Sequence, residues 1–294
     1  MRLAAALCIA LCTASVDAAT TRSPGGLSIA VDEREAYPGG LLTVRLHSRR
    51  PLRGIVYGIL DGRRCPAFPS ADGMRALVPV PVTFGPGPTT LGVEIRTSGG
   101  RQRFPVPVTI GRREYPPREV VLPDDKREIA VAPTGVREGR VLQSLLRTVS
   151  PRQEWRGPFR PPVEGVPAPT FGARETYLGA SAVDSRMDAI FGEYHRGIDY
   201  EVPPGTPVKA PASGIVLFAG PLGLSGTSVV VDHGQGLISV YSHLGRTSVR
   251  AGDSIEAGRV VGASGDSGVA AMPQLHWAVY LHGVAIDPRI TERL

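Results

Sequence analysis

The chain has 294 residues, of which 42% are hydrophobic, and its formal net charge is +6. This length and this share of hydrophobic residues suffice for two packed domains. The 36 glycines and 28 prolines predict many turns between short strands and argue against a helical bundle. Basic residues are scattered, without a basic and aromatic module of the kind that reads nucleic acid, so we expect no nucleic-acid partner.

Residues 1–19 have the pattern of a secretory signal peptide. Arg2 precedes a short apolar run, and Ala18 and Ala19 supply small residues at the cleavage site. The apolar run is shorter than the roughly 20 residues that span a membrane, and no later stretch approaches that length. We therefore expect export to the periplasm or the exterior, with no transmembrane segment. Cys65 would then stand alone, without a disulfide partner.

Residues 20–111 are predicted to form an immunoglobulin-like β-sandwich. Short runs such as LSIAV, LLTVRL and IVYGIL alternate with turn sequences such as YPGG and DGRR. Strands at this spacing are typical of such sandwiches. Nothing in this segment indicates catalysis.

Residues 112–169 are richer in charge and proline and predict a connector. Leu142, Leu145, Leu146 and Val149 fall on one helical face, which predicts a short amphipathic helix within it. The strand pattern returns over residues 170–294, so the fold class is mainly β.

The stretch EYHRGIDY places His195 and Asp199 four residues apart, with both side chains on one face. An imidazole and a carboxylate are ordinary zinc ligands, but a catalytic site needs three protein ligands. His233 and His282 lie in turn sequences that suit structural roles. His47 falls in the sandwich. Of the six histidines, His243 and His276 therefore remain as candidates for the third ligand.

The stretch QLHWAVY alternates polar and apolar residues, as a strand does. Gln274 and His276 should therefore point the same way, while Trp277 faces the core. Tyr241 is expected to be an ordinary packing residue.

Five segments, in order, resemble the lysostaphin/LytM-type zinc metallopeptidases: HRGID, GTPVKAPASGIV, VVVDHGQGLISVYSHL, VRAGDSIEAGRVVGASGDSG and LHWAVYLHGVAIDP. The resemblance covers roughly residues 155–288 and implies a C-terminal antiparallel β-sheet peptidase domain whose sheet floors an open groove. It implies Zn²⁺ held by His195, Asp199 and His276, with His243 as a catalytic residue beside the metal.

The same resemblance places a second catalytic histidine where this chain has Gln274. Glutamine donates and accepts hydrogen bonds but cannot take up a proton near neutral pH. If the missing imidazole is the principal base, the loss is about 10²–10⁴ in rate. If His243 is the base, an amide N–H can substitute at a smaller loss. The sequence leaves both open.

Two functions follow from the resemblance. The first is an exported zinc metalloendopeptidase that cleaves peptide bonds in peptidoglycan, with activity reduced by Gln274. The second is a non-catalytic zinc-binding member that binds cell wall or regulates a partner wall hydrolase. A lipoyl-like carrier would need a lysine at a hairpin tip, and Lys209 begins a strand instead. Two histidines and one carboxylate also match the ligand set of non-haem iron oxygenases, and metal analysis distinguishes iron from zinc.

Overall fold

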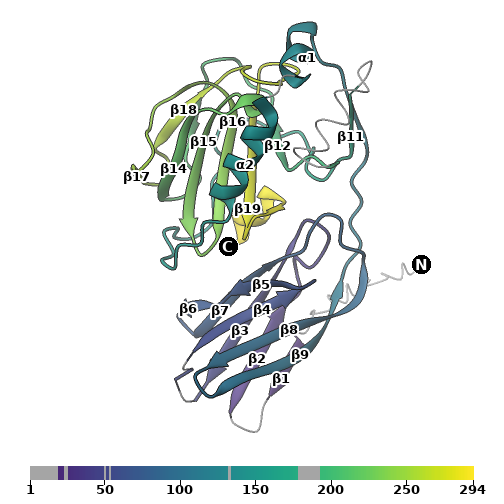
Figure 1. Ribbon diagram of the computed structural model, residues 1–294, viewed down its shortest axis with the longest axis vertical. Helices are drawn as coiled ribbons and strands as arrows, with labels where there is room; N and C mark the ends of the chain where they lie inside the picture. The colour runs from purple at the N-terminus through teal and green to yellow at the C-terminus, as the bar shows by residue number, and fades with distance from the viewer. Residues whose placement is uncertain (1–18, 23–25, 50, 53, 132–133, 178–192) are drawn as a thin grey trace, which may run out of the picture.

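The computed structural model of the protein describes residues 19–22, 26–49, 51–52, 54–131, 134–177 and 193–294. Its strands form sheets with antiparallel neighbours in both halves of the chain, which confirms the predicted mainly β class (Figure 1). The predicted signal peptide lies outside the described residues apart from Ala19, where strand β1 begins. None of the helices in these ranges has the length and apolar character needed to cross a membrane.

The N-terminal part consists of two sheets that enclose one hydrophobic core. The five-stranded sheet has the order β1-β2-β3-β7-β6, and the four-stranded sheet has the order β5-β4-β8-β9. The strands are β1 Ala19–Arg22, β2 Leu27–Asp32, β3 Leu41–Ser48, β4 Ile55–Leu60, β5 Arg63–Pro66, β6 Phe68–Ser70, β7 Gly73–Pro79, β8 Gly87–Thr97 and β9 Gly100–Ile110. Alternate residues of both sheets face this core, which includes Val44 and Val93. The part is thus a β-sandwich, and its immunoglobulin-like relationship stays a prediction.

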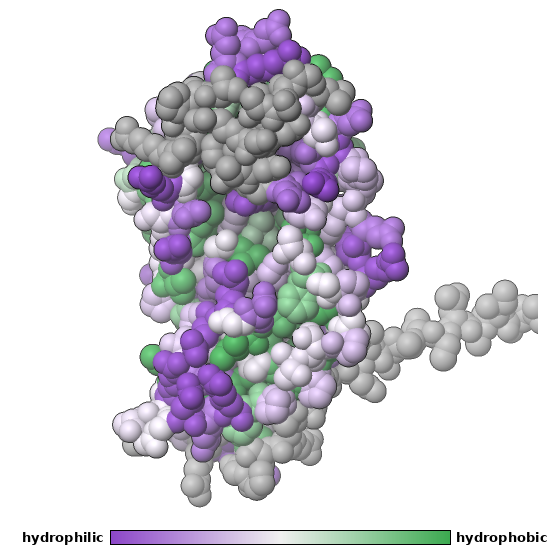
Figure 2. Space-filling view, turned by 45° about the vertical axis from the view of Figure 1, so that its right-hand side comes forward, coloured by the Kyte–Doolittle hydropathy of each residue, from purple (hydrophilic) through white to green (hydrophobic). Residues whose placement is uncertain are grey.

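The connector contains more regular structure than predicted. It holds β10 Arg118–Val120, α1 Asp124–Val131 and α2 Thr134–Leu146, and β11 Glu175–Tyr177 follows it within residues 170–294. Strands β10 and β11 pair in parallel and form a two-stranded ribbon. In Figure 1 the connector runs from the sandwich to the far end of the second domain, where α1 lies. Figure 2 shows hydrophilic surface at that end and hydrophobic patches across the middle of the molecule.

The C-terminal part is built on a nine-stranded sheet. Its principal path is β12-β19-β16-β15-β14-β17, with β13, β18 and β20 paired at its margins. The strands are β12 Gly197–Tyr200, β13 Pro207–Lys209, β14 Gly214–Pro221, β15 Thr227–Gly234, β16 Leu237–Thr247, β17 Ser254–Ile255, β18 Val260–Ser264, β19 Leu275–Leu281 and β20 Val284–Ile286. Two 3₁₀ helices, η1 Gly223–Ser225 and η2 Pro288–Arg293, complete it.

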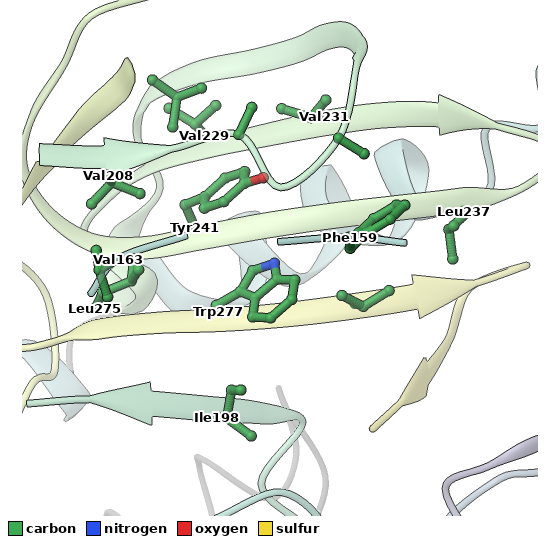
Figure 3. Close-up of a cluster of buried hydrophobic side chains, with 14 of the residues drawn as sticks. Phe159, Val163, Ile198, Val208, Val229, Val231, Leu237, Tyr241, Leu275 and Trp277 are labelled. Carbon is green, nitrogen blue, oxygen red and sulfur yellow. The ribbon is translucent and has the colours of Figure 1, made fainter. Parts of the chain in front are cut away.

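One face of this sheet packs into the largest core of the protein. Tyr241 of β16 and Trp277 of β19 are cross-strand partners and are fully buried there, so both predictions of packing roles are confirmed. Figure 3 shows the two rings side by side, with Ile198 from the neighbouring β12 beneath them. Along each of β12 and β19, successive side chains therefore point to opposite faces of the sheet.

The opposite face of the sheet carries α2. Leu142 and Leu146 pack there against residues that include Val240 and Tyr280. The sheet face predicted to floor an open groove is therefore partly covered by the connector. Val149 is not part of this contact: α2 ends at Leu146, and Val149 is 40% exposed. Pro151 disfavours helical backbone at the residue before it, so the helix cannot extend through this segment.

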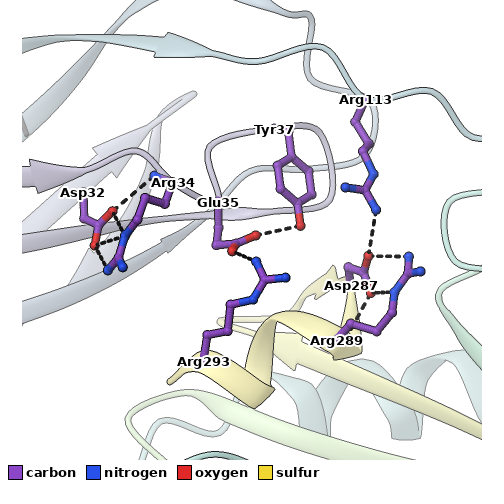
Figure 4. A network of polar contacts seen from close by, with 8 residues as sticks. All are labelled: Asp32, Arg34, Glu35, Tyr37, Arg113, Asp287, Arg289 and Arg293. Carbon is purple, nitrogen blue, oxygen red and sulfur yellow. Dashed lines mark hydrogen bonds and ion pairs between the residues drawn. The ribbon is translucent and has the colours of Figure 1, made fainter. Parts of the chain in front are cut away.

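Polar contacts join the sandwich to the end of the C-terminal domain (Figure 4). Arg293 of η2 pairs with Glu35, and the Tyr37 hydroxyl donates to the other oxygen of Glu35 at 2.8 Å. Arg113 of the connector lies 3.8 Å from Asp287, whose backbone N–H donates to the Gly39 carbonyl at 2.8 Å. Leu41 and Leu77 of the sandwich also belong to the main core of the C-terminal domain. The two domains therefore share one packed interface.

Candidate metal centre

Two paired strands bring an aspartate and a histidine together. Asp199 of β12 is the direct cross-strand partner of His276 of β19. Because their neighbours Ile198 and Trp277 point into the core, both polar side chains lie on the opposite face. Directly opposed side chains in an antiparallel pair have β-carbons about 4.5–5.5 Å apart. The strand register alone therefore places a carboxylate beside an imidazole.

His195 lies just before β12 and is held by its backbone. Its N–H donates to the Ala173 carbonyl at 2.8 Å, and its carbonyl accepts from the Gly172 N–H at 2.8 Å. The side chain is 10% exposed and points toward Asp199. The segment just after the connector thus holds the backbone of His195 beside the strand that follows.

The three side chains converge on one point. Asp199 Oδ1 lies 2.9 Å from His276 Nδ1 and 3.4 Å from His195 Nε2. One ligand atom from each residue lies within 4.8 Å of the other two. A tetrahedral zinc with bonds of about 2.0–2.1 Å separates its ligand atoms by about 3.3–3.4 Å. The donor types therefore fit a zinc ion with three protein ligands, and the 3.4 Å separation of Asp199 Oδ1 from His195 Nε2 matches this spacing.

Gly197 makes room for this arrangement. A β-carbon added there would lie 2.8 Å from His276 Nε2 and 2.5 Å from the Trp277 carbonyl oxygen. Both contacts are closer than atoms of these types approach. The glycine inside EYHRGIDY is therefore required for the His276 ring to reach Asp199.

The three side chains are buried, and their charges interact strongly. Burial opposes ionisation of Asp199, yet the imidazoles of His195 and His276 hold the pKa of its carboxyl well below the usual range. Burial lowers the pKa of His195, but the Asp199 carboxylate outweighs it and raises the value to about 9. In the absence of metal a proton therefore occupies His195, and a cation must displace it.

His243 stands beside the cluster, at the end of the regular part of β16. Its ring centroid is 6.1 Å from that of His276, and its Nδ1 lies 2.8 Å from the Ser267 carbonyl oxygen. That contact assigns the proton to Nδ1 and leaves Nε2 as the acceptor. Burial, with the charge of His276, lowers the pKa of His243 to about 4. Its φ of 61° is left-handed, which is uncommon for residues other than glycine.

Gln274 lines the same pocket as His243 and His276, as the alternation predicts. Its backbone N–H donates to the Gly265 carbonyl at 2.9 Å, and the residue is 7% exposed. An amide side chain thus occupies a buried position beside the imidazoles.

The other histidines lie elsewhere. His233 is buried, with Nδ1 2.8 Å from the Ser213 carbonyl and Nε2 2.8 Å from Ser239 Oγ, which is a structural role. His282 lies in the turn between β19 and β20 with a φ of 50°, and His47 lies on β3 of the sandwich.

The β10–β11 ribbon supplies residues that the sequence did not single out. Arg118, Glu175 and Tyr177 of this ribbon line the pocket. No local motif marks them, because their role depends on the ribbon's packing against a domain whose ligands lie far along the chain. The pocket is thus walled by both the connector and the sheet.

Comparisons with known proteins agree with this geometry. Residues 193–288 match the model of Peptidase family M23. This segment is a peptidase family M23 domain. The matched range contains all three residues of the cluster, together with His243 and Gln274, and leaves Arg118 outside.

Two curated relatives resemble the M23 domain. A protein of Neisseria meningitidis serogroup B named DD-carboxypeptidase/endopeptidase Mpg is 37% identical over 32% of this chain and 22% of its own length. Peptidoglycan DD-endopeptidase ShyC of Vibrio cholerae serotype O1 is 34% identical over 36% of this chain and 25% of its own length. The matched part spans a quarter or less of these relatives.

A solved structure is similar over more of the chain. The crystal structure of a protein assigned to peptidase M23 from Pseudomonas aeruginosa has 27% sequence identity and a TM-score of 0.64. The match covers 88% of this chain and 96% of that one. The likeness therefore extends beyond the M23 domain itself.

Proposed function

We propose that the protein is an exported zinc metalloendopeptidase that hydrolyses peptide bonds in peptidoglycan, with activity reduced by Gln274. The observation that carries this proposal is the convergence of Asp199 Oδ1, His195 Nε2 and His276 Nδ1, three zinc-ligand atoms, within 4.8 Å of one another. The names of the Neisseria and Vibrio relatives support peptidoglycan as the substrate. The pattern of residues 1–19 supports export.

His195, Asp199 and His276 would hold the metal, leaving a fourth position for water or substrate. Bound there, Zn²⁺ would lower the pKa of a water molecule and polarise the carbonyl of the scissile peptide bond. Asp199 contributes the one negative charge of the three ligands. The two imidazoles are neutral when they bind, so uptake of the ion releases the proton that His195 otherwise carries.

His243 acts as the base in this proposal. The Ser267 carbonyl fixes its tautomer, so that Nε2 can take a proton from the attacking water and later deliver it to the leaving amine. Because its pKa is lowered to about 4, the imidazole is neutral at pH 7 and available as an acceptor. The ring needs no reorientation before each proton transfer.

Gln274 supports the reaction without moving protons. Its amide N–H groups can stabilise negative charge that develops on the carbonyl oxygen. It cannot supply the second proton-transfer group that an imidazole would supply at the same position. We therefore assign the protein a lower rate than members of the family with two such imidazoles.

Gln274 also favours a second candidate function. A protein that keeps the metal ligands and lacks one proton-transfer group can serve as a zinc-stabilised module that binds cell wall or regulates a partner wall hydrolase. The two functions differ in one property: only the peptidase releases cleaved peptides from peptidoglycan on its own.

Digestion of purified peptidoglycan by the zinc-loaded mature chain tests the proposal, with products separated by chromatography and identified by mass. We expect peptide-bond cleavage that falls about 10²–10⁴-fold in His243→Ala. His47→Ala, an exposed histidine of the sandwich, is the matched control and should retain full activity. Absence of cleavage by both the wild type and Gln274→His, with zinc bound, would favour the regulatory function.

A further inference from the structure

The two oxygens of Asp199 have different partners. Oδ1 faces the imidazoles of His195 and His276. Oδ2 accepts a hydrogen bond from Arg118 Nη1 at 2.8 Å. The aspartate side chain is 3% exposed and that of the arginine is 30% exposed, so water screens this ion pair weakly.

Arg118 is itself held in place by the ribbon. In the parallel pairing of β10 with β11 it is the partner of Glu175, whose Oε1 lies 3.4 Å from Nη1. The Tyr177 hydroxyl donates to the other Glu175 oxygen at 3.1 Å. The backbone N–H of Arg118 donates to the Arg174 carbonyl at 2.8 Å. A chain of polar contacts therefore runs from Tyr177 through Glu175 and Arg118 to Asp199.

This chain of contacts begins outside the M23 domain. Arg118, Glu175 and Tyr177 all precede residue 193, where the family match starts. Arg118 is 81 positions from Asp199 in sequence and reaches it only because the ribbon packs against the pocket. A domain defined by residues 193–288 alone would leave Oδ2 without this partner.

We propose that Arg118 is a positioning residue of the metal centre, which holds the Asp199 carboxylate so that Oδ1 alone is presented to the metal. The inference rests on the proposed metal site. By engaging Oδ2, the guanidinium opposes rotation of the carboxylate and opposes binding of the ion through both oxygens. It also partners a buried oxygen for which the described residues supply no other hydrogen bond.

We expect loss of the Arg118 contact to weaken metal binding directly and to lower catalysis as a consequence. Partners that orient a metal-bound carboxylate or imidazole typically contribute about 10–100-fold to metal affinity or activity. An ion pair that only stabilised the fold would change the unfolding midpoint and leave the metal dissociation constant of the folded protein unchanged. The dissociation constant therefore separates the two roles.

The test compares the full mature chain with Arg118→Gln, which removes the charge, and Arg118→Lys, which keeps the charge and loses the planar fork. The Zn²⁺ dissociation constant is measured by competition with a chromophoric chelator. The visible spectrum of the Co²⁺-loaded protein reports the coordination geometry. Arg112→Met is the control, since Arg112 forms a connector ion pair with Glu114 in which both side chains are exposed.

We expect Zn²⁺ binding about 10–100-fold weaker in Arg118→Gln, a smaller loss in Arg118→Lys and none in Arg112→Met. The Co²⁺ spectrum should change in Arg118→Gln, because the carboxylate is then able to turn. Wild-type affinity and an unchanged spectrum in a folded Arg118→Gln would overturn the role of Arg118 and leave the metal site intact. A wild-type chain that binds no Zn²⁺ would overturn both proposals. If Arg118→Gln does not fold, Arg118→Lys decides: weaker binding supports the inference, and wild-type affinity overturns it.

Discussion

Glu138 on α2 joins the connector to the wall of the pocket. Its side chain is 3% exposed, and its two oxygens accept hydrogen bonds from backbone N–H groups of η1, Leu224 at 2.5 Å and Ser225 at 3.0 Å. Both of those residues line the pocket of the metal centre. We predict that Glu138→Ala destabilises the C-terminal domain and loosens this wall.

The magnitude follows from the two N–H groups. Without Glu138 the Leu224 N–H loses its acceptor, and a buried donor without an acceptor costs about 1–3 kcal/mol. The Ser225 N–H keeps the Leu222 carbonyl as an acceptor at 3.2 Å and adds little to this cost. Burial raises the pKa of Glu138, which shows that keeping the carboxylate here has its own cost and that removing it recovers part of the loss. The expected loss in unfolding free energy is therefore at the lower end, about 1–2 kcal/mol. Glu138→Gln keeps one acceptor oxygen and should lose about half as much.

Denaturant unfolding followed by tryptophan fluorescence measures this loss. Both tryptophans of the chain, Trp155 and Trp277, are buried in the core of the C-terminal domain and report on that domain. Glu128→Ala, an exposed glutamate on α1, is the control and should change stability by less than about 0.5 kcal/mol. Equal unfolding midpoints for Glu138→Ala and the control would refute the reasoning that η1 depends on this carboxylate.

Three further predictions concern the catalytic group and the sandwich. Gln274→His should raise the rate of peptidoglycan hydrolysis by about 10²-fold, the lower end of the range for one proton-transfer group, because His243 already supplies one; equal rates at equal zinc content would contradict this. At constant zinc content, kcat/KM should show no acid limb near pH 6.5 from His243, because burial lowers the pKa of this imidazole to about 4; an acid limb near 6.5 at constant zinc content would contradict it. In the sandwich, hydrogen bonds from Arg103 and Arg96 lower the pKa of Glu94 to about 2 from its usual 4.5. The stability that ionised Glu94 contributes to the folded protein is complete above pH 4.5 and is lost as the pH falls toward 2. The free energy of unfolding should therefore fall more steeply with decreasing pH in the wild type than in Glu94→Gln; parallel curves would contradict this.

Short-range patterns predicted the parts of the site that lie on regular strands. The alternation in QLHWAVY placed Gln274 and His276 on one face and Trp277 on the other, because a strand repeats every two residues. The i, i+4 spacing in EYHRGIDY likewise placed His195 and Asp199 on one side. The family resemblance then supplied His276 as the third member, and the cross-strand pairing of Asp199 with His276 brings it there.

The contributions of the connector could not be predicted in the same way. Arg118 and Glu138 act on residues more than 80 positions away, through packing that leaves no periodic signal in the sequence. The ribbon β10–β11 joins strands that are only three residues long and separated by α1 and α2, so no alternation identifies either strand. The left-handed backbone of His243 also has no sequence signal, since histidine does not mark such positions as glycine does.

Elemental analysis of the purified mature chain and of His195→Ala tests whether the three side chains bind one zinc ion. We expect about one zinc per wild-type chain and a strong loss in the variant, because removal of one of three ligands leaves an incomplete site. Undiminished zinc in a folded His195→Ala would contradict the convergence of His195, Asp199 and His276 on one ion.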